Sequence, residues 1–286
     1  MRLIAPALMT LALAGMGSQA WAQTLKVDYD LSLAGLPLGK ADLVSTFEGS
    51  KYQLEGVVKL AGLARMLTGG KGAGTASGAI VGGQLQSAGF AITAKSSSEQ
   101  RTLRMGMTGG NVAAVEIVPP FEEKPDRVPV KDADKRGVVD PMSALLMPAA
   151  ASGNLIDPAQ CNRTIPVFDG TMRFNVVLSY GETKAMEGPG YSGPVLVCNV
   201  RYVPIAGHRP ARPATKFMTE NKDISVWLAP VESQKVLVPV RIAMRTMLGM
   251  GVAEAANWSM EGEAKVVPAS GRPVRAKDSV KAGAAQ

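Results

Sequence analysis

Cysteine is the residue type in this chain that could do the most distinctive chemistry, and the chain has only Cys161 and Cys198. A catalytic thiol needs a neighbouring base, and a metal site needs more ligands than two cysteines and one histidine supply. If paired, the two cysteines close a loop of roughly 40 residues, which the chain-entropy model values at ~4 kcal/mol. Two cysteines allow one intramolecular pairing, so we predict a structural disulfide, with redox or intermolecular roles as alternatives.

Histidine limits the enzymatic hypotheses, because His208 is the only one in the chain. A two-histidine zinc motif is excluded, and a catalytic triad would have to use this single ring. The glycine and prolines of "GHRPARP" indicate that His208 lies in an exposed loop. Neither Gly-x-Ser-x-Gly nor Ser-x-x-Lys occurs. We therefore predict a protein that is not an enzyme and holds no metal or cofactor; an enzyme built on His208 or Asp169 is the alternative.

Two further segments have compositions found in functional sites. Residues 119–137, "PPFEEKPDRVPVKDADKRG", gather Glu122, Glu123 and Asp126, but the interleaved prolines and lysines favour a solvated segment over acid–base catalysis or calcium binding. We expect this segment to be disordered, with a binding lid as the alternative. Residues 68–83, "TGGKGAGTASGAIVGG", lack the spacing of a phosphate-binding loop. Their glycines predict curvature, bulges or close backbone approach in a bending sheet.

Methionine offers the best hint of a ligand site. Met244, Met247 and Met250 follow a three-residue spacing, and methionine adapts to irregular ligands such as acyl chains. Core packing is the alternative interpretation of all three. Asp169 precedes a glycine at a predicted tight turn, where its carboxylate can accept hydrogen bonds from nearby backbone amides or contact a ligand at the rim of the sheet. These four residues are the ligand-binding candidates.

The first 22 residues are typical of a cleaved signal peptide. Arg2 supplies the positive charge, residues 3–16 form an apolar run, and residues 20–22 form a small-x-small cleavage site. Met16 stands where a lipid-modified cysteine would be needed. We therefore expect a periplasmic protein that is not lipid-anchored, in an oxidising compartment where thiols pair.

Residues 264–286 form a basic segment rich in alanine, proline, glycine and lysine, within a chain of formal net charge +7. Because it has almost no bulky apolar residues to bury, it cannot offset the conformational entropy lost on ordering, so we predict a disordered tail. The tail could contact an anionic membrane surface. Nucleic acid is excluded as a partner, because no basic patch is interleaved with aromatic residues.

The residues between these ends, 23–263, alternate with a period of two. In "LKVDYDLSL", Leu25, Val27 and Tyr29 share one face while polar residues share the other; "KYQLEGVVKL" and "TMRFNVVLSY" repeat the pattern. Such alternation is typical of antiparallel strands with one buried face. We predict a single all-β domain, a curved antiparallel sheet that forms a barrel-like or spiral wrap.

Turn and helix signals complete this prediction. Gly109 and Gly110 can both adopt positive φ, which favours a two-residue hairpin. Short helices are expected in two places. In "DPMSALLMPAA" Asp140 can cap the helix and Pro141 suits its first position, and "GLARMLTGG", residues 62–70, is the second candidate.

Four motifs together resemble a family of exported bacterial proteins, domain of unknown function 3108: "YDLSLAGLPLGKADL", "VDPMSALL", "CNRTIPVFDG" and "VCNVRYVPIAGHRP". The order and spacing of the motifs carry the resemblance, which covers most of the chain. It implies an envelope location and a β-rich fold, with no established catalytic residues. The positions that match are Gly39, Asp140, Ser143, Cys161, Asp169, Gly170, Cys198 and Gly207.

Three functions follow from these observations. The first is a binding protein for an apolar ligand, either a lipid or a lipidated partner such as a lipoprotein. The second is a structural envelope factor that acts through protein–protein contacts. The third is the enzyme built around His208 or Asp169. The volume and lining of any cavity within the strands would separate the first from the second.

Overall fold

The computed structural model describes residues 22–62, 70–96, 99–149 and 153–262. The predicted signal peptide, the basic tail and the helix expected over residues 62–70 lie outside the described residues, apart from residues 22, 62 and 70 at their borders. Within the described ranges, no helix is both long enough and apolar enough to span a membrane.

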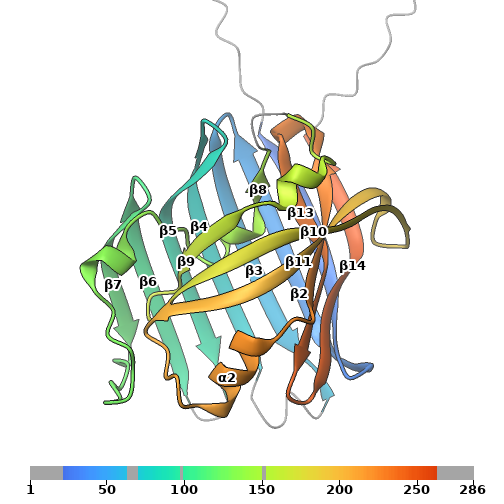
Figure 1. Cartoon of the computed structure of the whole chain (residues 1–286). Helices are drawn as coiled ribbons and strands as arrows, with labels where there is room; N and C mark the ends of the chain where they lie inside the picture. Colours follow the sequence, from blue (N-terminus) through green and yellow to red (C-terminus); the bar gives the residue numbers. More distant parts are fainter. Residues whose placement is uncertain (1–21, 63–69, 97–98, 150–152, 263–286) are drawn as a thin grey trace, which may run out of the picture.

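One antiparallel sheet dominates the molecule and curves round on itself, and the side that this curve encloses is here called the hollow (Figure 1). Its order is β7-β6-β5-β4-β3-β2-β1-β14-β13-β12-β11-β10-β9, with the short β8 paired to β13. The sheet does not close, because β7 and β9 are its two edges. This confirms the predicted all-β fold with a barrel-like wrap.

The first seven strands are β1 (Gln23–Leu33), β2 (Leu36–Glu48), β3 (Lys51–Leu60), β4 (Lys71–Val81), β5 (Gln84–Lys95), β6 (Gln100–Thr108) and β7 (Asn111–Val118). The others are β8 (Met147–Pro148), β9 (Thr164–Phe168), β10 (Arg173–Glu187), β11 (Ser192–Ala206), β12 (Ile224–Val231), β13 (Val236–Thr246) and β14 (Gly249–Glu261). The helical pieces are α2 (Pro213–Glu220) and the 3-10 turns η1 (Asp132–Lys135), η2 (Ser143–Leu145), η3 (Pro158–Cys161) and η4 (Glu232–Gln234).

The period-two alternation places apolar side chains on the inner face of the wrap. Leu25 and Val27 of β1 are at most 1% exposed, whereas Lys26 between them reaches solvent and pairs with Glu261. The same inner face carries Leu54 and Phe47, which are equally buried. Burial of these side chains provides the main stabilisation of the sheet.

Strand β13 brings the two halves of the sheet together. Its second half pairs with β14 from Arg241 onward, but its first half does not. In that first half Val236, Val238 and Val240 share a hydrophobic core with β1. The Tyr29 hydroxyl of β1 donates a hydrogen bond of 2.6 Å to the carbonyl oxygen of Pro239. The sheet therefore folds back over its own inner face at β13, which creates the hollow.

The Gly109–Gly110 hairpin is confirmed. These two glycines connect β6 to β7, and Thr108 and Asn111 pair on either side of them. Their φ values are +57° and +76°, the left-handed region that a tight two-residue hairpin turn requires.

The segment 138–149, here called the inner segment, crosses the hollow of the sheet (Figure 1). The sequence predicted a helix here, and that prediction was wrong. Only the 3-10 turn Ser143–Leu145 forms, and Met147 and Pro148 then pair with β13. Asp140 does accept hydrogen bonds from backbone amides, as expected of a cap, but pairing with β13 and burial among sheet side chains outweigh helix propensity.

Segment 119–137 was predicted to be disordered, and this prediction was also wrong. The backbone of Val128 exchanges hydrogen bonds with the segment after β11, donating to the His208 carbonyl and accepting from the Gly207 amide. Helix α2, which the sequence analysis did not anticipate, follows that segment. Its proline-rich approach puts Pro213 at the first helical turn, a favourable position for proline.

Candidate functional site: apolar cavities on the inner face

The inner face contains a cavity of about 390 Å³, here called the larger cavity. Strands β1 to β5 form its wall, and Met142, Leu145 and Ile242 lie opposite. Its lining is almost entirely apolar: Tyr29, Ala41, Asp42, Leu43, Gly56, Val57, Val58, Gly72, Ala73, Gly74, Ile92, Thr93, Ala94, Met142, Leu145, Ile242 and Ala253. Volume and lining both suit an apolar small molecule, since ligand pockets usually measure ~300–1,000 Å³.

Glycines make the room for this cavity. Gly56 pairs with Gly74 and Val58 with Gly72 across β3 and β4, so three glycines cluster on one face. A Cβ atom at Gly74 would lie 2.8 Å from the Met142 sulfur, so the methionine occupies that space. A Cβ atom at Gly72 would meet nothing closer than a carbonyl oxygen at 3.9 Å. The predicted close backbone approach is confirmed at Gly78, where a Cβ atom would collide with the backbone carbonyl oxygen of Gln86, and a predicted bulge lies between Ser77 and Gly78.

A smaller cavity of about 210 Å³ adjoins the larger one, and both are lined by Leu145 and Ile242. It lies between the inner segment and strands β9 to β13. Its lining is again apolar apart from one serine: Pro141, Ala144, Leu145, Met147, Ile165, Val167, Phe174, Val176, Leu178, Val200, Ile224, Ser225, Val226, Leu228, Pro239 and Ile242. The 3-10 turn of the inner segment thus separates two apolar spaces.

A buried polar cluster fixes this turn in the hollow. The Asp140 carboxylate is fully buried and accepts hydrogen bonds from the amides of Met142 (3.0 Å) and Ser143 (2.8 Å). It also accepts from the Ser143 hydroxyl (2.5 Å) and the Ser87 hydroxyl of β5 (2.7 Å). The Tyr52 hydroxyl of β3 donates to Ser143 Oγ at 2.8 Å. The cluster joins the inner segment to the sheet and thereby orients Met142 towards the larger cavity.

The predicted disulfide is present. Cys161 and Cys198 are bonded, with their Cα atoms 5.5 Å apart, and both are fully buried. They belong to a second hydrophobic core with Leu178, Leu196 and Leu237. The bond attaches η3 to β11 beside the smaller cavity and holds that wall in place.

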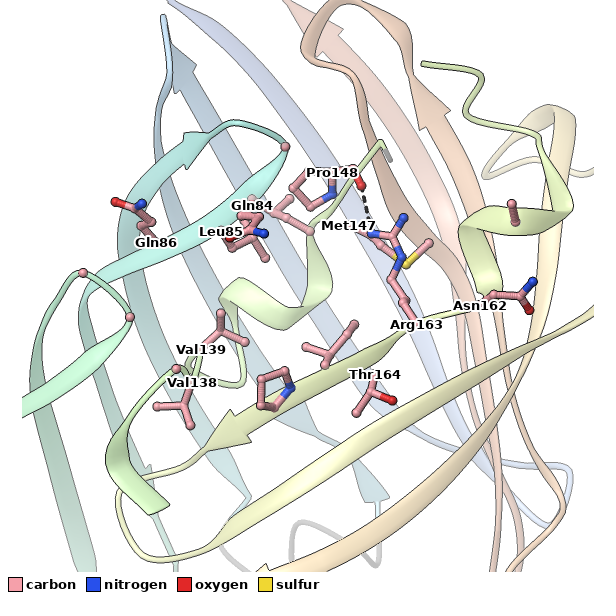
Figure 2. A pocket seen from close by; sticks show the side chains of 18 residues that line it. Gln84, Leu85, Gln86, Val138, Val139, Met147, Pro148, Asn162, Arg163 and Thr164 are labelled. Atoms are coloured by element: carbon pink, nitrogen blue, oxygen red, sulfur yellow. Dashed lines mark hydrogen bonds between the residues drawn. The ribbon is translucent and has the colours of Figure 1, made fainter. Parts of the chain in front are cut away.

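Arg163 performs a similar role above the cavities, in a polar cleft of about 570 Å³ (Figure 2). Its guanidinium donates to the carbonyl oxygens of Pro148 (2.9 Å) and Gln160 (2.8 Å) and to the Gln160 side chain. Figure 2 shows Arg163 directed towards Pro148. Partial burial lowers the pKa of Arg163 from its ordinary value. Arg163 therefore connects the inner segment to η3.

The methionines predicted to bind a ligand lie elsewhere. Met244 and Met250 belong to the β13–β14 hairpin, and Met247 is 62% exposed at its tip. None of the three lines either apolar cavity. The methionines that do are Met142 and Met147, both from the inner segment.

Asp169 forms the predicted turn. Its Oδ1 accepts hydrogen bonds from the Thr171 amide (2.8 Å), the Thr171 hydroxyl (2.9 Å) and the Met172 amide (2.6 Å). The carboxylate is not part of either cavity lining, and its role as a ligand contact stays a prediction. His208 is half-buried rather than exposed, and its Nδ1 has no hydrogen-bond partner within the described part of the chain.

The molecule is thus a β-barrel-like protein with an incompletely closed sheet and an apolar hollow. The chain belongs to the family described as "Protein of unknown function (DUF3108)", whose model matches residues 28–256. This confirms the resemblance carried by the four sequence motifs.

Among solved structures, the chain is similar to the crystal structure of a β-barrel-like protein of domain of unknown function DUF1849 from Brucella abortus. The two chains are 11% identical, with 83% of this chain and 97% of that chain covered and a TM-score of 0.45. No curated protein sequence matches this chain.

Proposed function

We propose that this protein is a periplasmic, non-enzymatic binding protein that holds an apolar ligand, a lipid or the acyl chain of a lipidated partner, in the cell envelope. The observation that carries the proposal is the larger cavity, about 390 Å³ of apolar space on the inner face next to a second apolar space. Polar groups are nearly absent from both linings, so the cavities favour hydrocarbon over a sugar, nucleotide or metal.

Gly72 gives the strongest support for a ligand, because neither backbone geometry nor crowding requires a glycine there. Its φ lies outside the left-handed region, and a Cβ atom would have space. Glycine within a strand costs ~0.5–1 kcal/mol relative to alanine, and protein interiors are normally packed densely. A glycine beside unfilled apolar space is therefore best explained if a ligand occupies that space.

An envelope location fits the Cys161–Cys198 disulfide, since such bonds persist in oxidising compartments. The disulfide and the signal-peptide pattern are independent arguments for export. Together with the apolar hollow they favour a carrier of envelope lipids.

The proposal is tested with N-phenyl-1-naphthylamine, an uncharged apolar dye whose fluorescence rises when it leaves water. We expect the dye to bind the delipidated full chain. The Gly72→Leu variant, whose side chain fills the larger cavity, should bind the dye at least tenfold more weakly. Gly106→Leu is the matched control, because a Cβ atom at Gly106 meets nothing within 4 Å and Gly106 lines neither apolar cavity. Equal binding by both variants and the native chain would contradict the proposal.

A structural factor acting through protein–protein contacts is the second candidate, and the open edge of the sheet favours it. Strand β7 has a partner on one side only, and Val115 and Val118 on it are 38% and 52% exposed. Edge strands can accept an added strand from another chain. Val115→Pro would abolish such pairing and leave dye binding unchanged; crosslinking of native and variant chains in the envelope distinguishes the two functions.

A further inference from the structure

A cleft with an excess of positive charge lies at the lower end of the hollow, between the start of β6, the segment 121–127, the β10 and β11 ends and α2. We call it the basic cleft; its volume is about 650 Å³. Its lining consists of Arg101, Phe121, Glu122, Lys124, Arg127, Thr171, Met172, Tyr202, Gly207, His208, Arg209, Arg212, Ala214, Thr215 and Met218.

The cations of the basic cleft are only partly neutralised. Three of them pair with carboxylates: Arg101 with Glu99, Lys124 with Glu122, and Arg209 with Asp126. Arg127 and Arg212 form no ion pair with any residue that the structure describes. The cleft therefore keeps an excess of positive charge between partly apolar walls, and Arg212 contributes to the field that lowers the pKa of the Asp126 carboxyl.

Arg127 is held in place by two backbone carbonyl oxygens and an aromatic ring, none of which carries a negative charge. Its Nε donates to the Gly207 carbonyl oxygen (2.5 Å) and its Nη2 to the Thr171 carbonyl oxygen (2.6 Å). The guanidinium also lies 4.3 Å above the ring centroid of Phe121. Among the described residues, Nη1 and one Nη2 hydrogen have no acceptor. A fixed guanidinium with free donors suits bidentate binding of phosphate or carboxylate.

The basic cleft is next to both apolar cavities. Arg101 of the cleft pairs in register with Ala94, which lines the larger cavity, and residues directly opposite in an antiparallel pair share a face. On the opposite wall, Tyr202 of the cleft and Phe174 of the smaller cavity have ring centroids 5.2 Å apart. A ligand could therefore place one end among cations and the other among apolar side chains.

We infer that the ligand is an anionic amphiphile, whose phosphate or carboxylate head group binds in the basic cleft at Arg127 and Arg212 while its hydrocarbon chain occupies the larger cavity. This inference rests on the proposed function and adds the class of head group to it. Electrostatic attraction provides selectivity for the anion, and burial of the chain provides most of the affinity.

The test compares three probes on the delipidated full chain. Decyl phosphate and decanol of equal chain length are followed by displacement of the dye, and inorganic phosphate is followed by isothermal titration calorimetry. We expect decyl phosphate to bind at least tenfold more tightly than decanol at low ionic strength, with the preference shrinking as salt rises. Arg212→Gln should reduce this preference about tenfold without changing decanol affinity, because Arg212 forms no ion pair in the described structure. Arg136→Gln is the matched control, an exposed arginine outside the cleft.

Each outcome decides between the two proposals. Equal affinity for decyl phosphate and decanol would overturn the anionic head group and leave the apolar cavity intact. Loss of preference in Arg136→Gln equal to that in Arg212→Gln would also overturn it. Binding of inorganic phosphate as tight as that of decyl phosphate would make the cleft a site for free phosphate, contrary to the amphiphile. If neither decyl phosphate nor decanol displaced the dye, the result would contradict the proposed function itself.

Discussion

The two ends of the inner face differ although the same strands build them. At the upper end of β3 and β4, Tyr52, Leu54 and Ala76 are at most 3% exposed and fully packed. Two residues further along, Gly56 and its partner Gly74 open into the larger cavity. The β3–β4 register continues without interruption through both ends, so the change comes from side-chain size and not from a change in secondary structure.

This difference shows that one strand pair can provide stability at one end and a cavity at the other. The packed end is joined to the inner segment by the Asp140 cluster, and the opposite wall is held by the disulfide and Arg163. Together they provide the stability that the open end lacks. Ligand pockets on rigid scaffolds commonly depend on such a separation. Variants at the packed end should change stability more than dye binding, and variants at the open end should do the reverse.

Removal of the disulfide is expected to have the largest effect. Cys161→Ala with Cys198→Ala releases a connection between residues 37 apart and should lower the free energy of unfolding by ~4 kcal/mol. Urea unfolding measures the change, and reduction of the native chain should give a similar shift. A loss below ~1 kcal/mol would show that the packed end does not depend on this bond.

Asp140→Ala should have the next largest effect, about 3 kcal/mol. The substitution leaves the amides of Met142 and Ser143 and two hydroxyls without their buried acceptor. Ser143→Ala removes fewer partners and should cost about 1 kcal/mol. Equal losses for the two variants would indicate that the cluster does not act through the carboxylate.

Alkaline pH tests the burial of two tyrosines, Tyr52 at the packed end and Tyr29 beside the larger cavity. Burial raises the pKa of Tyr29 and of Tyr52 above the ordinary phenol value of 10.0, so the unfolded chain loses these protons first. Their contribution to stability is complete below pH 10 and is lost as pH rises through the folded-state values, at about 1.4 kcal/mol per pH unit for each phenol. Unfolding by urea between pH 9 and 11 should show this slope, and Tyr29→Phe should lessen it. Unchanged stability up to pH 11 would contradict the burial.

The smallest effect concerns contact between the open end and the inner segment. Gly74→Ala puts a Cβ atom against the Met142 sulfur and should cost about 1 kcal/mol through overpacking. Met142→Ala in the same chain should remove that cost, so the double-mutant cycle should yield a coupling of about 1 kcal/mol. Additive effects would mean that Met142 does not occupy the space above Gly74.

Local patterns predicted much of this fold. Strand alternation, the Gly109–Gly110 turn and the Asp169 turn depend on neighbouring residues, and all are present. The disulfide, between residues 37 apart, could be predicted because the chain has only two cysteines. The predicted helix at Asp140 failed because its partners, Ser87 and Tyr52, lie on strands more than 50 residues away. Long-range contacts of this kind leave no periodic signal.

The cavity could be predicted only in part. Glycines at alternate positions of β4, Gly72 and Gly74, reveal a face without side chains, but not that Leu145 and Ile242 come to lie opposite. Similarly, the prolines and charges of segment 119–137 indicated solvent exposure, whereas Arg127 binds two distant carbonyl oxygens and orders it.

Native mass spectrometry of the full chain, isolated from a bacterial envelope under non-denaturing conditions, tests the central claim most directly. The account predicts an added mass of an acyl-chain compound on the native chain and on Gly106→Leu, and none on Gly72→Leu. Bare protein in all three preparations, or the same adduct on all three, would contradict a ligand in the larger cavity.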